Sequence, residues 1–184
     1  MLARTLSRAG LATAAAPALA LALTLGVTPA AHAATLTASD GAAGDQFGRS
    51  VSGSGTTGLV GAYRHEISPN DLQGAAYVFR NIDTATGTVY ESVKLTASDG
   101  AAYDIFGYSV SLSGTTGLVG ARYDDDAGGD SGSAYVFRNL DTATGTINEN
   151  VKLTASDGAA SDWFGSSVSL SGASGLIGAW GDDM

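Results

Sequence analysis

Short segments in which apolar and polar residues alternate recur along most of the chain. Ser109–Ser113 reads Ser-Val-Ser-Leu-Ser, so Val110 and Leu112 share one face of a predicted strand. Residues 117–121 form a short apolar run, which is typical of a strand buried on both faces. Residues 134–138 alternate again. The period is two throughout, so the pattern predicts strands and not helices.

A fourth strand of the same unit is expected at residues 147–155. The alternation there predicts that Val151 and Leu153 face inward and that Lys152 faces outward. Glycine-rich turns separate the predicted strands, and the turn at residues 114–117 has the composition of a hairpin. Each unit is therefore expected to hold four antiparallel strands.

The chain repeats this unit three times. The string LTASDGAA begins at Leu36, Leu95 and Leu153, so its starts are spaced 59 and then 58 residues apart. Four strands in about 58 residues is the size of one propeller blade. We divide the chain into repeats at residues 36–94, 95–152 and 153–184. One phenylalanine occupies the same position in every unit and is expected to pack between blades: Phe47, Phe106 and Phe164.

Each unit opens one strand with Phe-Gly and closes the next strand with Gly-Ala, as at Gly61-Ala62. This pattern resembles the FG-GAP repeat, the blade unit of the integrin α-subunit propeller and of many bacterial surface proteins. The resemblance covers residues 36–184. It implies an all-β fold of tandem four-stranded antiparallel blades, forming a partial β-propeller after an N-terminal signal peptide.

The sequence departs from this pattern in two places. The proline that follows Gly-Ala in the family is replaced by Tyr63, Arg122 and Trp180. Integrin-type repeats carry an Asp-rich calcium loop between the Phe-Gly and Gly-Ala strands. Here that connection is only residues 113–117 in the second repeat, and it contains no carboxylate. The integrin-type calcium site is therefore not expected.

Two complete units, an initial strand near Leu36 and two further strands do not close a propeller, which has four to eight blades. We expect a truncated product, and the alternatives are assembly from several copies or an open stack. The strands near residues 167–170 and 176–179 are expected to leave open blade edges. Open edges pair with other chains, so self-association is expected.

Residues 1–33 have the pattern of a secretory signal peptide. Two arginines precede the apolar run of residues 11–27, and an Ala-x-Ala cleavage site follows at residues 31–33. We predict that the mature chain begins at Ala34, consists of FG-GAP-like repeats over residues 34–184, and is secreted or held at the cell surface.

A transmembrane anchor is the alternative for the same segment. Pro17 interrupts its apolar run and no positively charged stop-transfer segment follows, so the signal peptide is favoured. The mature chain contains no apolar run of about 20 residues, so no membrane span is expected there.

The charge and the cysteine content of the chain argue against two further kinds of function. The formal net charge of −9 argues against nucleic acid as a partner, and the chain has no cysteine for disulfides or thiolate chemistry.

One acidic loop carries the candidate metal ligands. Asp124, Asp126 and Asp130 are spaced so that a flexible glycine-containing loop could present them to calcium, which takes six to eight oxygen ligands. The alternative is a solvated acidic turn. The first repeat has Arg-His-Glu at residues 64–66 instead, so the candidate site does not belong to every repeat.

The units also share a pair of aspartates, for which we expect a role in the turn, the second carboxylate accepting backbone N–H groups. Metal binding or acid–base catalysis is the alternative. The pairs are Asp40 with Asp45, Asp99 with Asp104, and Asp157 with Asp162. Signatures such as G-x-S-x-G, H-E-x-x-H and the P-loop are absent from the sequence, and His65 is expected in a surface loop. The chain is therefore not expected to be an enzyme.

The resemblance to FG-GAP repeats and the predicted secretion together favour an exported, non-catalytic module for binding or adhesion. Its ligand, an extracellular protein or a glycan, would contact residues 63–73 and 122–131, because these loops lie at one end of the blades and differ between repeats. Two alternatives stay open. The repeats could form a purely structural surface or envelope scaffold, or they could be the appendage of an exported hydrolase.

Overall fold

The computed structural model describes residues 20–23 and 33–183, and the described residues form strands and turns without a helix. The all-β prediction is confirmed. The strands are β1 (Ala20–Leu23), β2 (Ala33–Thr37), β3 (Ser50–Ser54), β4 (Thr57–Ala62), β5 (Ala75–Phe79), β6 (Gly87–Tyr90), β7 (Val93–Thr96), β8 (Ser109–Ser113), β9 (Thr116–Ala121), β10 (Ser133–Phe137), β11 (Gly145–Asn148), β12 (Val151–Leu153), β13 (Phe164–Ser171) and β14 (Ser174–Ala179).

Most of the predicted signal peptide lies outside the described residues. Within it, residues 20–23 are described as β1, which pairs antiparallel with β2, and Ala33 is the first residue of β2. The cleavage site before Ala34 stays a prediction.

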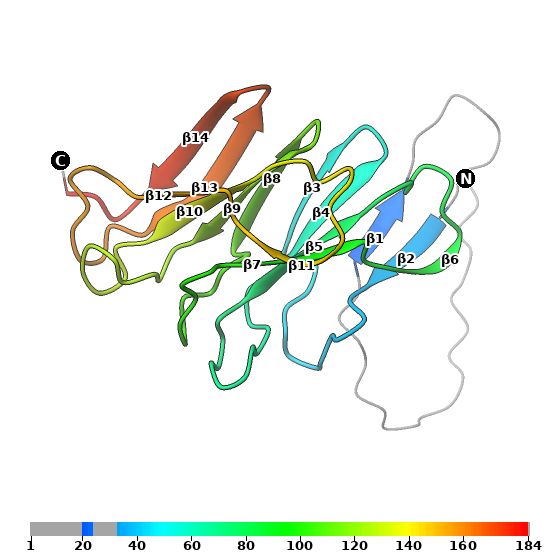
Figure 1. Ribbon diagram of the computed structural model, residues 1–184. Coiled ribbons are helices and arrows are strands. Elements are labelled where there is room, and N and C mark those ends of the chain that lie inside the picture. The colour runs from blue at the N-terminus through cyan, green and yellow to red at the C-terminus, as the bar shows by residue number, and fades with distance from the viewer. Residues whose placement is uncertain (1–19, 24–32, 184) are drawn as a thin grey trace, which may run out of the picture.

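Two antiparallel sheets correspond to the complete repeats. Blade 1 has the strand order β3-β4-β5-β7 and blade 2 has the order β8-β9-β10-β12. The hairpin of β13 and β14 begins a third unit. The sheets stand side by side in an open row, with β2 and β6 at one end and β13 and β14 at the other (Figure 1). The predicted tandem of four-stranded antiparallel blades is therefore present.

Residues 147–155 form two strands in two sheets, and the prediction of a single fourth strand was wrong. β11 pairs in parallel with β7 of blade 1, whereas β12 pairs with β10 of blade 2. The chain changes partner at Asn150, whose N–H donates to the carbonyl of Val136 at 2.8 Å. The Oδ1 atom of Asn150 accepts the backbone N–H of Arg138 at 2.6 Å.

The same crossing occurs one repeat earlier, where β6 pairs in parallel with β2. Each crossing strand therefore extends the sheet that precedes its own unit. These backbone hydrogen bonds join neighbouring units, in addition to the packing of their side chains.

The two faces of β12 also differ from the prediction. Val151 is 37% exposed and Leu153 is only partly buried, whereas the equivalent Val93 and Leu95 of β7 are fully buried. Val93 and Leu95 belong to the core shared with blade 2, against which Ile147 of β11 packs. Lys152 does not point freely outward, because its ammonium group lies among carboxylates.

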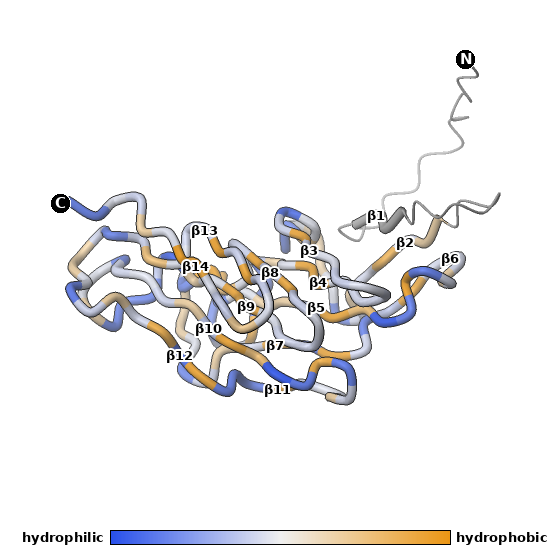
Figure 2. The backbone as a smooth tube through the Cα atoms, turned by 90° about the horizontal axis from the view of Figure 1, so that it is seen from above, coloured by the Kyte–Doolittle hydropathy of each residue, from blue (hydrophilic) through white to orange (hydrophobic). Residues whose placement is uncertain are grey.

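The described residues form two apolar cores, and the larger core lies between blade 1 and blade 2. Leu59 and Leu95 of blade 1 meet Phe106 and Phe137 of blade 2 there, and all four are buried. The ring of Phe106 lies 5.3 Å from that of Tyr135, in an edge-to-face arrangement. The prediction of packing between blades is confirmed for Phe106, whereas Phe47 belongs to the smaller core with β2 and Phe164 is only partly buried. Seen from above, the apolar positions follow the strands and the hydrophilic positions gather in the connections (Figure 2).

The Phe-Gly pair of one unit lies against the Gly-Ala pair of the unit before it. The N–H of Gly107 donates to the carbonyl of Gly120 at 3.0 Å. A Cβ atom on Gly120 would lie 2.0 Å from the carbonyl oxygen of Gly165, so only glycine fits. Gly61 and Gly107 repeat this contact one blade earlier. The two dipeptides are therefore the backbone junction between successive units.

Candidate functional site

An acidic cluster at the end of blade 2 surrounds the ammonium group of Lys152. Its Nζ atom lies 2.5 Å from Oδ2 of Asp99, 2.5 Å from Oδ2 of Asp126 and 3.1 Å from Oδ2 of Asp124. Asp124 is buried and also accepts hydrogen bonds from the hydroxyls of Ser133 and Tyr135, both at 2.8 Å. Lys152 therefore neutralises part of a buried acidic network.

The candidate calcium ligands are only partly brought together. Oxygen atoms of Asp99, Asp124 and Asp126 lie within 4.8 Å of one another, whereas Asp130 is not part of this group. The N–H of Asp130 instead donates to Oδ1 of Asp125 at 2.8 Å. Three carboxylates could serve a cation, but Lys152 already places its own charge between them. The calcium site stays a prediction, and in this arrangement the lysine competes directly with the metal.

This arrangement shifts the pKa values of Lys152 and Asp99. Burial disfavours the charged form of Lys152, but hydrogen bonds to Asp126, Asp99 and Asp124 outweigh burial and raise its pKa above the usual value. Burial likewise disfavours the ionised form of Asp99, and the hydrogen bond from Lys152 nevertheless holds its pKa below the ordinary range. Both shifts favour the ionised forms of Lys152 and Asp99.

The first repeat builds a related cluster around Lys94. The ammonium group lies 2.5 Å from Oδ2 of Asp40 and 2.8 Å from Nε2 of His65. Nδ1 of the same ring lies 2.8 Å from Oδ2 of Asp45, and the Tyr77 hydroxyl donates to Asp40 at 2.8 Å. Burial works against the charge of Asp40, but the hydrogen bonds from Lys94 and Tyr77 hold its pKa below the usual value.

The expectation that His65 is a surface residue was wrong, because this side chain is 6% exposed and forms part of the cluster. His65 stands three residues after Ala62, as Asp124 stands three residues after Ala121. Superposing the repeats on their Gly-Ala pairs would have placed His65 in the buried position. The loop after Gly-Ala is one residue shorter in the second repeat, and beyond it Lys94 aligns with Lys152, whose place in a cluster the sequence analysis did not predict.

The second aspartate of each pair has the predicted role in the turn. Its carboxylate accepts the backbone N–H three residues earlier, at 2.8 Å in Asp45, 2.6 Å in Asp104 and 2.6 Å in Asp162. Asp104 is buried, and within the described part of the chain no cationic side chain forms an ion pair with it. Burial, and the charges of Asp124, Asp125 and Asp99, raise its pKa to about 7, although the N–H of Ala101 favours the ionised form.

A second polar site lies between the ends of blades 1 and 2, and we call it the tyrosine–arginine pocket. Its volume is about 260 Å³, and its lining consists of Arg49, Tyr63, Arg64, Leu72, Tyr103, Ile105, Tyr108, Arg122 and Tyr123. The guanidinium carbon of Arg122 lies 4.1 Å from the ring centre of Tyr108 and 4.5 Å from that of Tyr123. Its Nη1 and Nη2 atoms donate to the two hydroxyls at 3.0 Å and 2.8 Å.

Sequence reasoning identified only part of this pocket. Tyr63 and Arg122 were recognised as departures at the position after Gly-Ala, but Arg49, Tyr103 and Tyr108 were not connected with them. They come from the segments that enter β3 and β8, and the junction between blades brings them together. The pocket therefore borders the loops for which ligand contacts were predicted.

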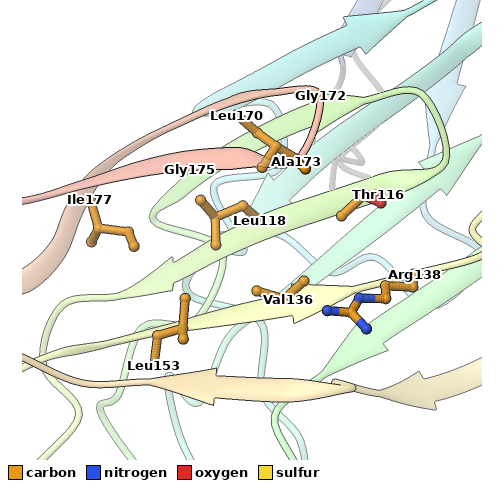
Figure 3. Close-up of a pocket in the computed structure, with 10 residues that line it drawn as sticks. All are labelled: Thr116, Leu118, Val136, Arg138, Leu153, Leu170, Gly172, Ala173, Gly175 and Ile177. Carbon is orange, nitrogen blue, oxygen red and sulfur yellow. The ribbon is translucent and has the colours of Figure 1, made fainter.

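An apolar groove of about 440 Å³ separates blade 2 from the β13–β14 hairpin. Leu118, Val136 and Leu153 of blade 2 line it beside Leu170 and Ile177 of the hairpin (Figure 3). In the equivalent space between blades 1 and 2, the aromatic strand β10 and the segment after it fill the core with Tyr135, Phe137 and Leu140.

The sequence profile of the FG-GAP repeat family matches the chain in three segments, residues 31–79, 89–137 and 147–184. Each segment contains one Phe-Gly pair and the Gly-Ala pair that follows it. No curated protein matches the chain. Within the described residues, no helix has the length and apolar character needed to cross a membrane.

Proposed function

This chain belongs to the FG-GAP repeat family, and we propose that it is an exported, non-catalytic binding module. Repeats of this family are typical of extracellular proteins. The proposed ligand contacts the loops after β4 and β9, residues 63–73 and 122–131. An extracellular protein and a glycan are both ligands of the expected kind.

The observation that carries this proposal is a repeated framework that holds two dissimilar loops. The strands before and after the loops are nearly identical in the two units, whereas the loops read YRHEISPNDLQ and RYDDDAGGDS. A scaffold that keeps its strands and varies the loops at one end is the common arrangement of binding proteins.

Backbone hydrogen bonds to the next unit also hold both loops in position. The N–H groups of Ile105 and Phe106 donate to the carbonyls of Leu72 and Gln73, at 3.1 Å and 2.9 Å. The N–H of Trp163 donates to the carbonyl of Asp130 at 3.2 Å, which repeats the contact one unit later. Loops that are fixed before binding lose less conformational entropy when a ligand binds.

Binding of the secreted chain to immobilised extracellular polysaccharides and matrix proteins tests the proposal. Glu66→Arg and Ala127→Arg place long charged side chains at exposed positions of the two loops and should abolish retention of the ligand. Thr86→Arg and Thr144→Arg, at the opposite end of the strands, are the matched controls and should bind normally. The N-terminus of the secreted protein, expected at Ala34, tests export in the same preparation.

Three results would contradict the proposal. Equal loss of binding in loop and control variants would show that the loop end is not the binding surface. Release of cleavage products from a bound polysaccharide would show catalysis. Absence of any ligand, together with association of the chain with itself, would favour the structural scaffold.

The scaffold is the second candidate, because the apolar groove continues the pattern of the interface between blades. An aromatic strand fills the equivalent space between blades 1 and 2, and a second copy of the chain carries two such strands. Copies joined in this way would build an extended array.

A further inference from the structure

The tyrosine–arginine pocket concentrates positive charge in an acidic protein. The formal net charge is −9, and both lysines of the repeats are occupied by the carboxylates of their clusters. Among the described residues, none of the three arginines of the pocket forms an ion pair with a carboxylate. Arg49, Arg64 and Arg122 therefore bring three positive charges to one small site, where an anionic group would be attracted.

Arg122 is held in position before any ligand arrives. Its guanidinium group packs on the rings of Tyr108 and Tyr123 and donates to both hydroxyls. The Nε atom is buried, and among the described residues no acceptor binds it. A buried donor without an acceptor is costly, so the unbound pocket contains an unsatisfied polar group.

The pocket also exposes an aromatic ring at a strained position. Tyr103 is 58% exposed and has a φ of 74°, in the left-handed region that disfavours every residue with a Cβ atom. The first repeat has Gly44 in this place, with a φ of 103°. A glycine would relieve the strain here as well, so the tyrosine ring at this position points to a use outside the stability of the fold.

The lining matches the surface of a sugar. Tyrosine presents an apolar ring face and a polar hydroxyl, and a pyranose likewise combines a C–H face with hydroxyl groups. Pockets that enclose drug-sized ligands are about 300–1,000 Å³, so the volume of about 260 Å³ suits one ring of a longer chain. Leu72 and Ile105 are the only aliphatic lining residues, which leaves little apolar surface for the side chains of a peptide.

The same face continues toward the third repeat. Trp180 occupies the position that Tyr63 and Arg122 hold in the other repeats. Its ring lies 4.3 Å from that of Trp163 and the side chain is 68% exposed. An extended saccharide could therefore contact aromatic rings one repeat apart.

We infer that the tyrosine–arginine pocket binds an anionic saccharide, through arginine contacts to a carboxylate or sulfate and ring contacts to the sugar. This inference rests on the proposed binding function and gives it a ligand class. An acidic peptide, the other class that arginines recognise, is an outcome of the test.

Calorimetric titration of the secreted chain tests the inference with four defined probes: a trigalacturonate, a sulfated disaccharide, a neutral glucan trisaccharide and the peptide Glu-Glu-Glu. One or both anionic saccharides should bind, with an affinity that falls as salt is added, and the two arms distinguish carboxylate from sulfate. The neutral sugar and the peptide should bind at least about tenfold more weakly.

Substitutions separate the pocket from the fold. Arg49→Gln and Arg64→Gln change exposed side chains and together should weaken binding about tenfold. Arg138→Gln removes the same charge at the apolar groove and should have no effect. Tyr103→Gly should weaken binding without lowering Tm, because it removes the strained left-handed tyrosine. A residue with a merely structural role would not separate binding from stability in this way.

Equal affinity for the neutral sugar, equal affinity for the acidic peptide, or unchanged binding by the arginine variants would overturn the inference. If the loop variants Glu66→Arg and Ala127→Arg still abolished binding of some other ligand, the pocket would be wrong and the binding module would stand. If those loop variants and the arginine variants all bound every ligand normally, both proposals would fall.

Discussion

The buried carboxylate of Asp104 is expected to lower the stability of the folded protein at neutral and higher pH. Burial and three acidic neighbours raise its pKa to about 7, against an ordinary value of 3.8. Between these two values the folded state keeps a proton that the unfolded state has lost. Stability from this group is therefore fully present below pH 3.8 and is lost as the pH rises through about 7.

Asp104→Asn removes this dependence while keeping an oxygen atom that can accept the N–H of Ala101. From pH 5 to pH 7 each pH unit should cost the wild-type protein about 1.4 kcal/mol through this group. The stability advantage of the variant should therefore grow by about 2–3 kcal/mol between pH 5 and pH 8. For a chain of this length that corresponds to roughly 5–10 °C in Tm.

Thermal melts of wild type and variant at pH 5, 6, 7 and 8 measure the difference directly. Taking the difference cancels the other titrating groups, including Asp40 and Asp99, whose lowered pKa values act in the opposite direction. Asp141→Asn removes the same charge from an exposed turn and serves as the control. A difference that does not change with pH, or one that the control reproduces, would refute the reasoning.

Three further predictions follow from the clusters, the junctions and the groove. Calorimetry should detect no tight calcium binding by the wild type, and tight binding would contradict this account. The Lys152→Met substitution should lower the free energy of unfolding by about 3 kcal/mol, and millimolar calcium should restore part of that loss. In chemical denaturation, Gly120→Ala should lower the free energy of unfolding by at least about 3 kcal/mol, because its Cβ atom would clash with the backbone of Gly165. Gly129→Ala has open space around it and should leave the free energy of unfolding nearly unchanged. In light scattering, residues 34–184 should self-associate at micromolar concentration, and Ile177→Lys in the groove should reduce that association. A monomeric protein whose molar mass does not change with dilution would contradict this prediction.

Much of the framework could be predicted because the sequence of each strand occurs two or three times in the chain. The alternation in Ser109–Ser113 and the Gly-Ala pairs set strand positions by purely local rules. Those rules did not predict the pairing of residues 147–155, because an alternating pattern indicates the two faces of a strand but not the strand with which it pairs. The switch from β7 to β10 at Asn150 depends on hydrogen bonds between distant parts of the chain.

The site residues were harder to predict for the same reason. Lys152 and Asp99 are 53 residues apart and meet because β12 ends beside the turn that follows β7. The alternation assigned Lys152 outward, which describes the direction of its Cβ but not the reach of its long side chain. The tyrosine–arginine pocket combines positions that differ between the repeats, so the repeat pattern marked Tyr63 and Arg122 as departures but did not indicate that they share a pocket.

The most direct test of the binding function is amide hydrogen exchange of the secreted chain with and without the trigalacturonate probe. We predict slower exchange in residues 63–73, 122–131 and 103–108, with little change in the turns at the opposite end of the strands. Protection confined to β12 and β14, or no protection at a saturating concentration of the probe, would contradict a ligand site at the loop end of the blades.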